Sequence, residues 1–150
     1  IIMLGDGSLR TELVDLSKAL KIDGVIEFMG KVPQTKVVEI LNSSHVFVTV
    51  SLSDGNSLSL IESMACGAYP IATFIPANEE WIKDDINGSF VKIGDVEGLA
   101  KHILNAYNNF DSIIENAMIE SDKIIAEKGT WQINMKKMEN TYLNLCSNVK

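Results

Sequence analysis

Residues 51–73 read SLSDGNSLSLIESMACGAYPIAT, and this stretch decides the fold. The apolar run Val46–Val50 precedes it, and a second apolar run, Pro70–Thr73, ends it. Between the two runs, Ser57–Cys66 has the small and apolar residues of a helix that Gly67 stops. A strand, a helix and a second strand in this order predict two parallel strands joined by a crossover helix.

The same alternation of short apolar runs and helical patterns extends in both directions. The other apolar runs are Ile1–Leu4, Val25–Phe28 and Phe90–Ile93. Because Val46–Val50 is almost wholly apolar, we expect it to be a central strand that is buried on both faces. The sequence therefore predicts the α/β class, with a Rossmann-like parallel sheet of about five or more strands and helices on both faces.

The helical patterns also predict which faces are buried. Four leucines with helical spacing form one stripe that should lie on the sheet: Leu9, Leu13, Leu16 and Leu20. Little of the helix at Ser57–Cys66 should face water. The last third is predicted to be helical, with one pattern at residues 99–106, a second at Ile113–Ile125 and a third that starts at Trp131.

Composition bounds the class of protein. With 150 residues, 46% hydrophobic and 22% charged, the chain fits one globular domain over residues 1–150. The first residues already form an apolar run, so we interpret the chain as a fragment. A net charge of −7 argues against a nucleic-acid-binding surface. Two cysteines without metal-site or disulfide spacing favour a reducing, cytoplasmic setting.

Asp54 and Glu62, with seven residues between them, are the candidate functional carboxylates. Asp54 and Gly55 fall in the loop after the predicted central strand. Asn56 and Ser57 then occupy the place of the helix N-cap, which leaves the N–H groups of Ser57 and Leu58 exposed, with that of Ser59 as a further candidate donor. This arrangement predicts a backbone anion site that needs no positive side chain.

Glu62 is the more ambiguous of the two carboxylates. A carboxylate on a buried helix face is costly unless it is hydrogen-bonded, and ribose hydroxyls would supply two donors. Alternatively, Glu62 points to solvent or accepts a hydrogen bond from Ser59 or Ser63. Spacing alone leaves the two interpretations level.

Two further turns follow predicted strands. Gly5 and Gly7 flank Asp6 before a helix, where glycines let the backbone approach a phosphate. Val32 lies in the turn Gly30–Pro33, where it could pack on the face of a base. Taken alone, the first turn is as often structural as functional, and a rigid connector is the favoured interpretation of the second.

With its neighbours, the central stretch resembles the signature of the large group 1 family of retaining GT-B glycosyltransferases. That signature has two acidic residues at this separation, a helix that reads like E-A-M-A-C-G and a P-V-x-A-T strand. The flanking segments IIMLGDGSLRTEL and VIEFMGKVP resemble the family's G-x-G turn and F-x-G-x-V/I-P turn. Asn78–Ile82, Asn87–Val91 and the Trp131 helix resemble its later features.

The resemblance implies that this chain is the donor-binding half of a glycosyltransferase that acts with retention of configuration. Glu62 would bond the ribose, and Asp54, where the family usually has Glu, would hold hydroxyls of the transferred sugar. The loop residues Gly55, Asn56, Ser57 and Leu58 would contact the diphosphate or the sugar. Gly5 and Gly7 would line the phosphate side, and Val32 would contact the base.

The resemblance also implies partners. It implies a nucleotide diphosphate sugar as substrate, no metal and no other cofactor, because the family neutralises the leaving diphosphate with backbone amides, a helix end and basic side chains. A separate N-terminal domain would bring a glycan or lipid-linked acceptor and any peripheral contact with the inner face of the membrane. No nucleic acid is expected as a partner.

Two other functions remain open. A sugar-nucleotide epimerase of related fold would need a histidine near the cleft, yet His45 heads a core strand and His102 lies in a late helix. A non-catalytic nucleotide-sugar-binding domain is the second alternative, for which Asp54 in place of Glu is the only hint.

Overall fold

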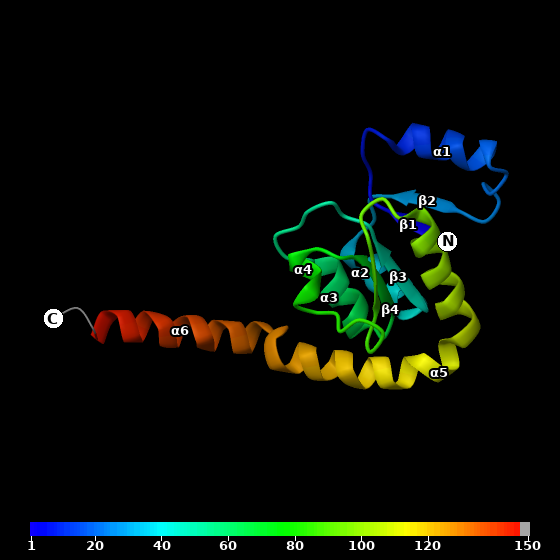
Figure 1. Cartoon of the computed structure of the whole chain (residues 1–150). Helices are drawn as coiled ribbons and strands as arrows, with labels where there is room; N and C mark the ends of the chain where they lie inside the picture. Colours follow the sequence, from blue (N-terminus) through cyan, green and yellow to red (C-terminus); the bar gives the residue numbers. More distant parts are fainter. Residues whose placement is uncertain (148–150) are drawn as a thin grey trace. The chain divides into compact units, whose positions relative to one another are not determined.

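The computed structural model describes residues 1–147, which divide into two compact units. Unit 1 is Ile1–Ile40, and unit 2 begins at Leu41. Each of the two units has its own sheet, with two strands in unit 1 and three in unit 2 among the described residues. Figure 1 shows the order of the elements along the chain.

Unit 1 consists of β1 (Ile2–Leu4), α1 (Arg10–Ala19) and β2 (Glu27–Gly30), followed by α2 (Gln34–Asn42), which runs into unit 2. The two strands are parallel, with Met3 opposite Phe28. A side-chain bond joins helix to strand, because Arg10 donates to the carbonyl of Phe28 at 2.8 Å. Unit 1 is thus a small β-α-β arrangement, as the sequence predicts.

The leucine stripe of α1 does not lie buried on a sheet, and this prediction is wrong. Its members are exposed: Leu9 by 61%, Leu13 by 39%, Leu16 by 51% and Leu20 by 59%. Ser17 is the buried residue of α1, and its hydroxyl donates to the carbonyl of Val14. The helical spacing correctly predicts the helix, but spacing alone does not supply a surface that covers its apolar side.

Unit 2 contains a parallel sheet of β3 (Val46–Thr49), β4 (Tyr69–Thr73) and β5 (Ser89–Val91), in the order β3-β4-β5. The central strand is therefore β4, in which all five residues are buried. The prediction that Val46–Val50 forms the central strand is wrong, since β3 lies at one edge of this sheet and Val48 is 39% exposed.

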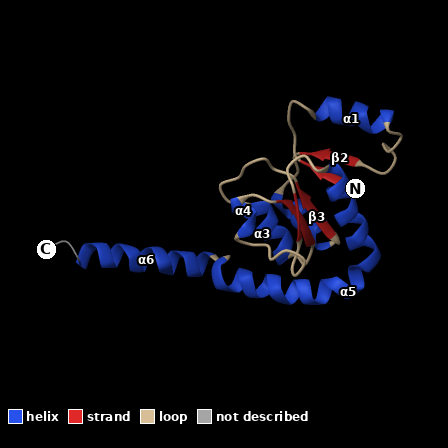
Figure 2. Cartoon of the chain, in the orientation of Figure 1, coloured by secondary structure: helices blue, strands red, loops and turns tan. Residues whose placement is uncertain are grey.

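Helices cover both faces of β4, and this explains its burial. Ala72 belongs to a core cluster with Leu60 and Met64 of α3 (Leu58–Ala65). Tyr69 and Ile71, which are buried with it, belong to a second cluster with Ala106 and Ala117 of α5 (Val96–Lys128). Because side chains alternate along a strand, the two clusters lie on opposite sides of β4. The predicted α/β class with helices on both faces is confirmed in unit 2 (Figure 2).

The C-terminal helices follow α4 (Pro76–Glu79) and β5. Asp95 caps α5 by accepting a hydrogen bond from the N–H of Gly98 at 2.8 Å. The two helical patterns predicted before Lys128 form this single helix, which is interrupted by non-helical dihedrals at Asn109. Figure 1 shows α5 changing direction in its yellow part. The next helix, α6 (Trp131–Ser147), has no buried residue.

Within residues 1–147, none of the helices is both long enough and apolar enough to cross a bilayer.

Candidate functional site

Asp54 lies exposed in the loop that leaves the carboxyl end of β3, as the sequence predicts. Its carboxylate organises the loop: Oδ1 accepts a hydrogen bond from the N–H of Asn56 at 3.1 Å. The other oxygen, Oδ2, lies 3.3 Å from the hydroxyl of Ser57. A carboxylate that bonds the backbone two residues on forms an Asx turn, which holds the loop in one shape. Asp54 is therefore pre-oriented by its own neighbours.

Ser57 is the N-cap residue of α3, but its side chain does not cap the helix. It is 2% exposed, and its hydroxyl donates to Oδ1 of Asn78 at 2.5 Å. Asn78, in α4, is fully buried and donates from Nδ2 to the carbonyl of Thr73 at 2.8 Å. A buried polar chain thus ties the Asp54 loop to the carboxyl end of β4.

The sequence reasoning missed Asn78 as a partner of this loop. It names Asn78 only as part of a resemblance over Asn78–Ile82. One signal was present: Asn78 follows the apolar run that ends at Thr73, and loops after neighbouring parallel strands meet at the same edge of a sheet.

One of the backbone donors predicted at the start of α3 is engaged within the loop. The N–H of Leu58 donates to the carbonyl of Asn56 at 2.8 Å, so this predicted donor is engaged within the loop. The first bond inside the helix runs from the N–H of Ile61 to the carbonyl of Ser57. By helix geometry, the N–H groups of Ser59 and Leu60 have no acceptor further back in the helix. These groups, with the helix dipole, favour an anion here.

Glu62 lies on an exposed face of α3, so the prediction that little of this helix faces water is wrong. Leu58, one turn before it on the same face, is 63% exposed. Ser63 is buried and donates to the carbonyl of Leu60 at 2.7 Å, so its hydroxyl proton is committed elsewhere. The Glu62 carboxylate is accessible without a burial cost. Burial raises the pKa of the Cys66 thiol, and the negative charge of Glu62 raises it further.

The remaining predicted residues lie in unit 1. Gly5 has a φ of +106°, which favours glycine, and its N–H donates to the carbonyl of Gly30 at 2.9 Å. This bond links the turns after β1 and β2. The N–H of Gly7 bonds Oδ1 of Asp6, and Val32 is half-buried. The glycines thus have a clear structural role within their own turn.

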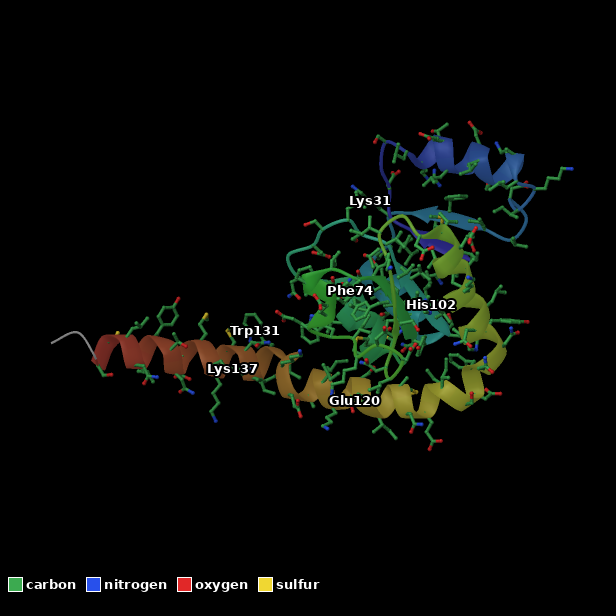
Figure 3. All side chains as sticks on the ribbon, in the orientation of Figure 1. Lys31, Phe74, His102, Glu120, Trp131 and Lys137 are labelled. Atoms are coloured by element: carbon green, nitrogen blue, oxygen red, sulfur yellow. The ribbon has the colours of Figure 1, made fainter. Side chains whose placement is uncertain are left out.

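The two histidines lie in structural positions. The ring of His45 packs edge-to-face on Phe110, with 4.9 Å between ring centroids. His102 lies on α5, while Trp131 and Lys137 lie on α6 (Figure 3).

A family model and a curated relative indicate one family for this chain. The model of the family described as "Glycosyl transferases group 1" matches residues 1–123. N-acetyl-alpha-D-glucosaminyl L-malate synthase of Bacillus anthracis is 32% identical over 100 residues, which cover 67% of this chain and 26% of that protein. The chain therefore spans only a part of the length of this relative.

Solved structures share the fold. A glycosyltransferase from Rickettsia africae has a TM-score of 0.89 at 20% identity, covering 98% of this chain and 40% of that one. Anabaena HepE, in complex with UDP-glucose, has a TM-score of 0.83 at 18% identity, covering 94% of this chain and 40% of that one. The Rossmann-like half of a GT-B fold is thereby confirmed, and, because the family model matches most of its residues, the chain belongs to the group 1 glycosyltransferases.

Proposed function

We propose that this chain binds the nucleotide-sugar donor of a glycosyltransferase that transfers the sugar to a glycan or lipid-linked acceptor. The observation that carries the proposal is the loop and helix from Asp54 to Glu62. Its carboxylates are exposed at two places, and the start of α3 lies between them. Leu58 and Glu62 are about 6 Å apart along the helix axis, which is a suitable step from a phosphate to a ribose.

The proposal assigns a role to each part of this segment. The N–H groups of the first turn of α3 hold the diphosphate, helped by the dipole of the helix. Glu62 accepts hydrogen bonds from the ribose, and Asp54 accepts them from the sugar. The loop residues Gly55, Asn56, Ser57 and Leu58 surround these groups. In unit 1, Gly5 and Gly7 are assigned to phosphate and Val32 to the base.

The same groups would act in the reaction. As the sugar–phosphate bond breaks, negative charge grows on the leaving diphosphate, and fixed N–H dipoles stabilise that charge without reorganisation. We propose that the reaction retains the anomeric configuration, needs no metal ion and takes place in the cytoplasm, with the acceptor brought by another domain at the inner face of the membrane.

The relatives guide the choice of donor. One relative is named for an N-acetylglucosaminyl group, and one solved structure holds UDP-glucose. We therefore propose UDP-N-acetylglucosamine as the first donor to test. The epimerase alternative is not favoured, because the chain belongs to the group 1 glycosyltransferases and the ring of His45 packs on Phe110. The second alternative is a non-catalytic binding domain. Sugar transfer by the enzyme that contains this chain would exclude it.

The test is an NMR titration of the chain with UDP, GDP and ADP and with UDP-N-acetylglucosamine, GDP-mannose and ADP-glucose. Amide shifts should cluster at Asp54–Glu62 in unit 2 and near Gly5 and Val32 in unit 1. Glu62→Ala should weaken binding about ten-fold, as expected for a lost charged hydrogen bond. EDTA should leave the titration unchanged.

Glu115→Ala is the matched control, since Glu115 is also an exposed helical glutamate of unit 2. It should bind nucleotides like the wild type. Equal binding by the Glu62 and Glu115 variants would contradict the role of Glu62. A wild type that shows no shifts with any nucleotide at millimolar concentration would contradict donor binding by this chain.

A further inference from the structure

The hydroxyl of Ser57 has one proton and two neighbouring acceptors. Oδ1 of Asn78 lies 2.5 Å from Oγ, and Oδ2 of Asp54 lies 3.3 Å from it. A hydroxyl donates one hydrogen bond, so it serves only one of these acceptors at a time. The shorter distance favours Asn78.

The orientation of the Asn78 amide is fixed by its other partner. Nδ2 donates to the carbonyl of Thr73 at 2.8 Å, and the side chain is fully buried. A flipped amide would place Oδ1 against this carbonyl, leaving two acceptors face to face in a buried site. Oδ1 therefore points at Ser57, where it can only accept a hydrogen bond from the hydroxyl.

The carbonyl end of β4 is itself anchored to the loop. Thr73, 1% exposed, donates from Oγ1 to the carbonyl of Ser51 at 2.6 Å. Two hydrogen bonds thus connect β4 and α4 to the segment that carries Asp54, a part-buried one at Ser51 and a buried one at Ser57. The buried side of the loop is held from both ends.

We propose that Asn78 is a positioning residue that draws the Ser57 proton away from Asp54 and keeps Oδ2 of Asp54 open to a sugar hydroxyl. Oδ1 of Asp54 is occupied by the N–H of Asn56, so Oδ2 is the oxygen that the loop leaves to a ligand. Without Asn78, the Ser57 hydroxyl turns to Oδ2, and a sugar hydroxyl must displace it. This inference rests on the proposed function, because it concerns the sugar that Asp54 would bind.

The test compares two ligands, a nucleotide sugar and its bare nucleotide, on the same chain. Asn78→Ala should raise the dissociation constant of UDP-N-acetylglucosamine about ten-fold, the effect of one competing hydrogen bond, and that of UDP by less than about two-fold. GDP-mannose with GDP and ADP-glucose with ADP serve as further pairs. General loosening of the loop would weaken both members of a pair alike.

Asn87→Ala is the matched control. Asn87 is also a fully buried asparagine of unit 2, and it accepts from the N–H of Lys83 and donates to the carbonyl of Trp81. The Asn87→Ala variant should lose about as much stability as Asn78→Ala. It should keep the wild-type ratio between the affinities for UDP-N-acetylglucosamine and for UDP. Asn78→Leu, which is close to asparagine in size, replaces the alanine variant if that variant fails to fold.

The double variant Ser57→Ala/Asn78→Ala gives the sharpest result. Removing the hydroxyl removes the competitor, so the affinity ratio should return toward the wild-type value although the chain is less stable. This ratio is the affinity for UDP-N-acetylglucosamine divided by the affinity for UDP. If this ratio stays below the wild-type value in the double variant, or is equal in the Asn78 and Asn87 variants, the inference is overturned while wild-type donor binding still stands. No binding of any pair to the wild type overturns the proposed function and this inference together.

Discussion

β4 and β1 are both short, apolar, parallel strands, but their burial is opposite. All five residues of β4 are buried, Ile71 and Ala72 completely, whereas Ile2, Met3 and Leu4 of β1 are all exposed. α3 and α5 pack on the two faces of β4, while α1 buries only Ser17. Burial therefore depends on the helices that cover a strand more than on the apolar composition of the strand.

The largest expected effect tests the packed side of this comparison. Leu60 of α3 is fully buried against Ala72 of β4. Leu60→Ala should lower the free energy of unfolding by about 2–5 kcal/mol, because it removes buried methyl groups and leaves a cavity. Urea unfolding followed by the fluorescence of Trp81, in the same cluster, measures the loss. Leu58→Ala, on the exposed face of the same helix, should cost less than about 0.5 kcal/mol.

A smaller effect is expected on the other face of β4. The hydroxyl of Tyr69 pairs with Oγ of Ser89 at 2.9 Å in a buried site. Tyr69→Phe should lower the free energy of unfolding by about 1 kcal/mol, since it leaves the serine hydroxyl without this partner. A neutral or stabilising substitution, measured by urea unfolding at neutral pH, would contradict the importance of this pair.

The same tyrosine predicts a pH dependence. Burial raises the pKa of Tyr69 above its usual value, an effect that the bond with Ser89 partly offsets and Asp85 and Asp84 reinforce. A raised pKa in the folded state means that stability is present below the pKa of the unfolded chain and is lost as the pH rises through it. Between about pH 9 and pH 11, the wild type should lose more stability than Tyr69→Phe.

The smallest effect is expected in unit 1. Leu16 of α1 is 51% exposed, although its spacing marks it as part of an apolar stripe. Leu16→Ala should change the free energy of unfolding by less than about 0.5 kcal/mol, because little apolar surface is buried there and alanine favours helix. A loss as large as that of Leu60→Ala would show that α1 is covered in solution.

The strand and helix order was predictable because short apolar runs and helical spacing are local signals. The sequence locates the five strands of residues 1–147 within a few residues, including β3 and β4 on either side of α3. It cannot say which strand is central: Val46–Val50 is the more apolar run, yet the smaller residues of Pro70–Thr73 fit between two helices. Sheet order is decided by packing between distant elements.

The spacing predicts Asp54, Ser57 and Glu62 as site residues, and the structure puts Ser57 at the N-cap of α3. The engaged N–H of Leu58 and the contact between Ser57 and Asn78 were not predictable, because the first depends on the local path of the loop and the second joins residues that lie far apart in the sequence.

One feature of α5 determines how the core of unit 2 can come apart. Ala106 and Ala117 lie in one cluster of the core, and Ile124 of the same helix lies in the other. Since α5, which is interrupted at Asn109, contributes residues to both clusters, neither cluster can open widely while the other keeps all its contacts. We therefore expect the core of unit 2 to unfold cooperatively. The loop that carries Asp54 should then keep its anchoring bonds only while the whole core is folded.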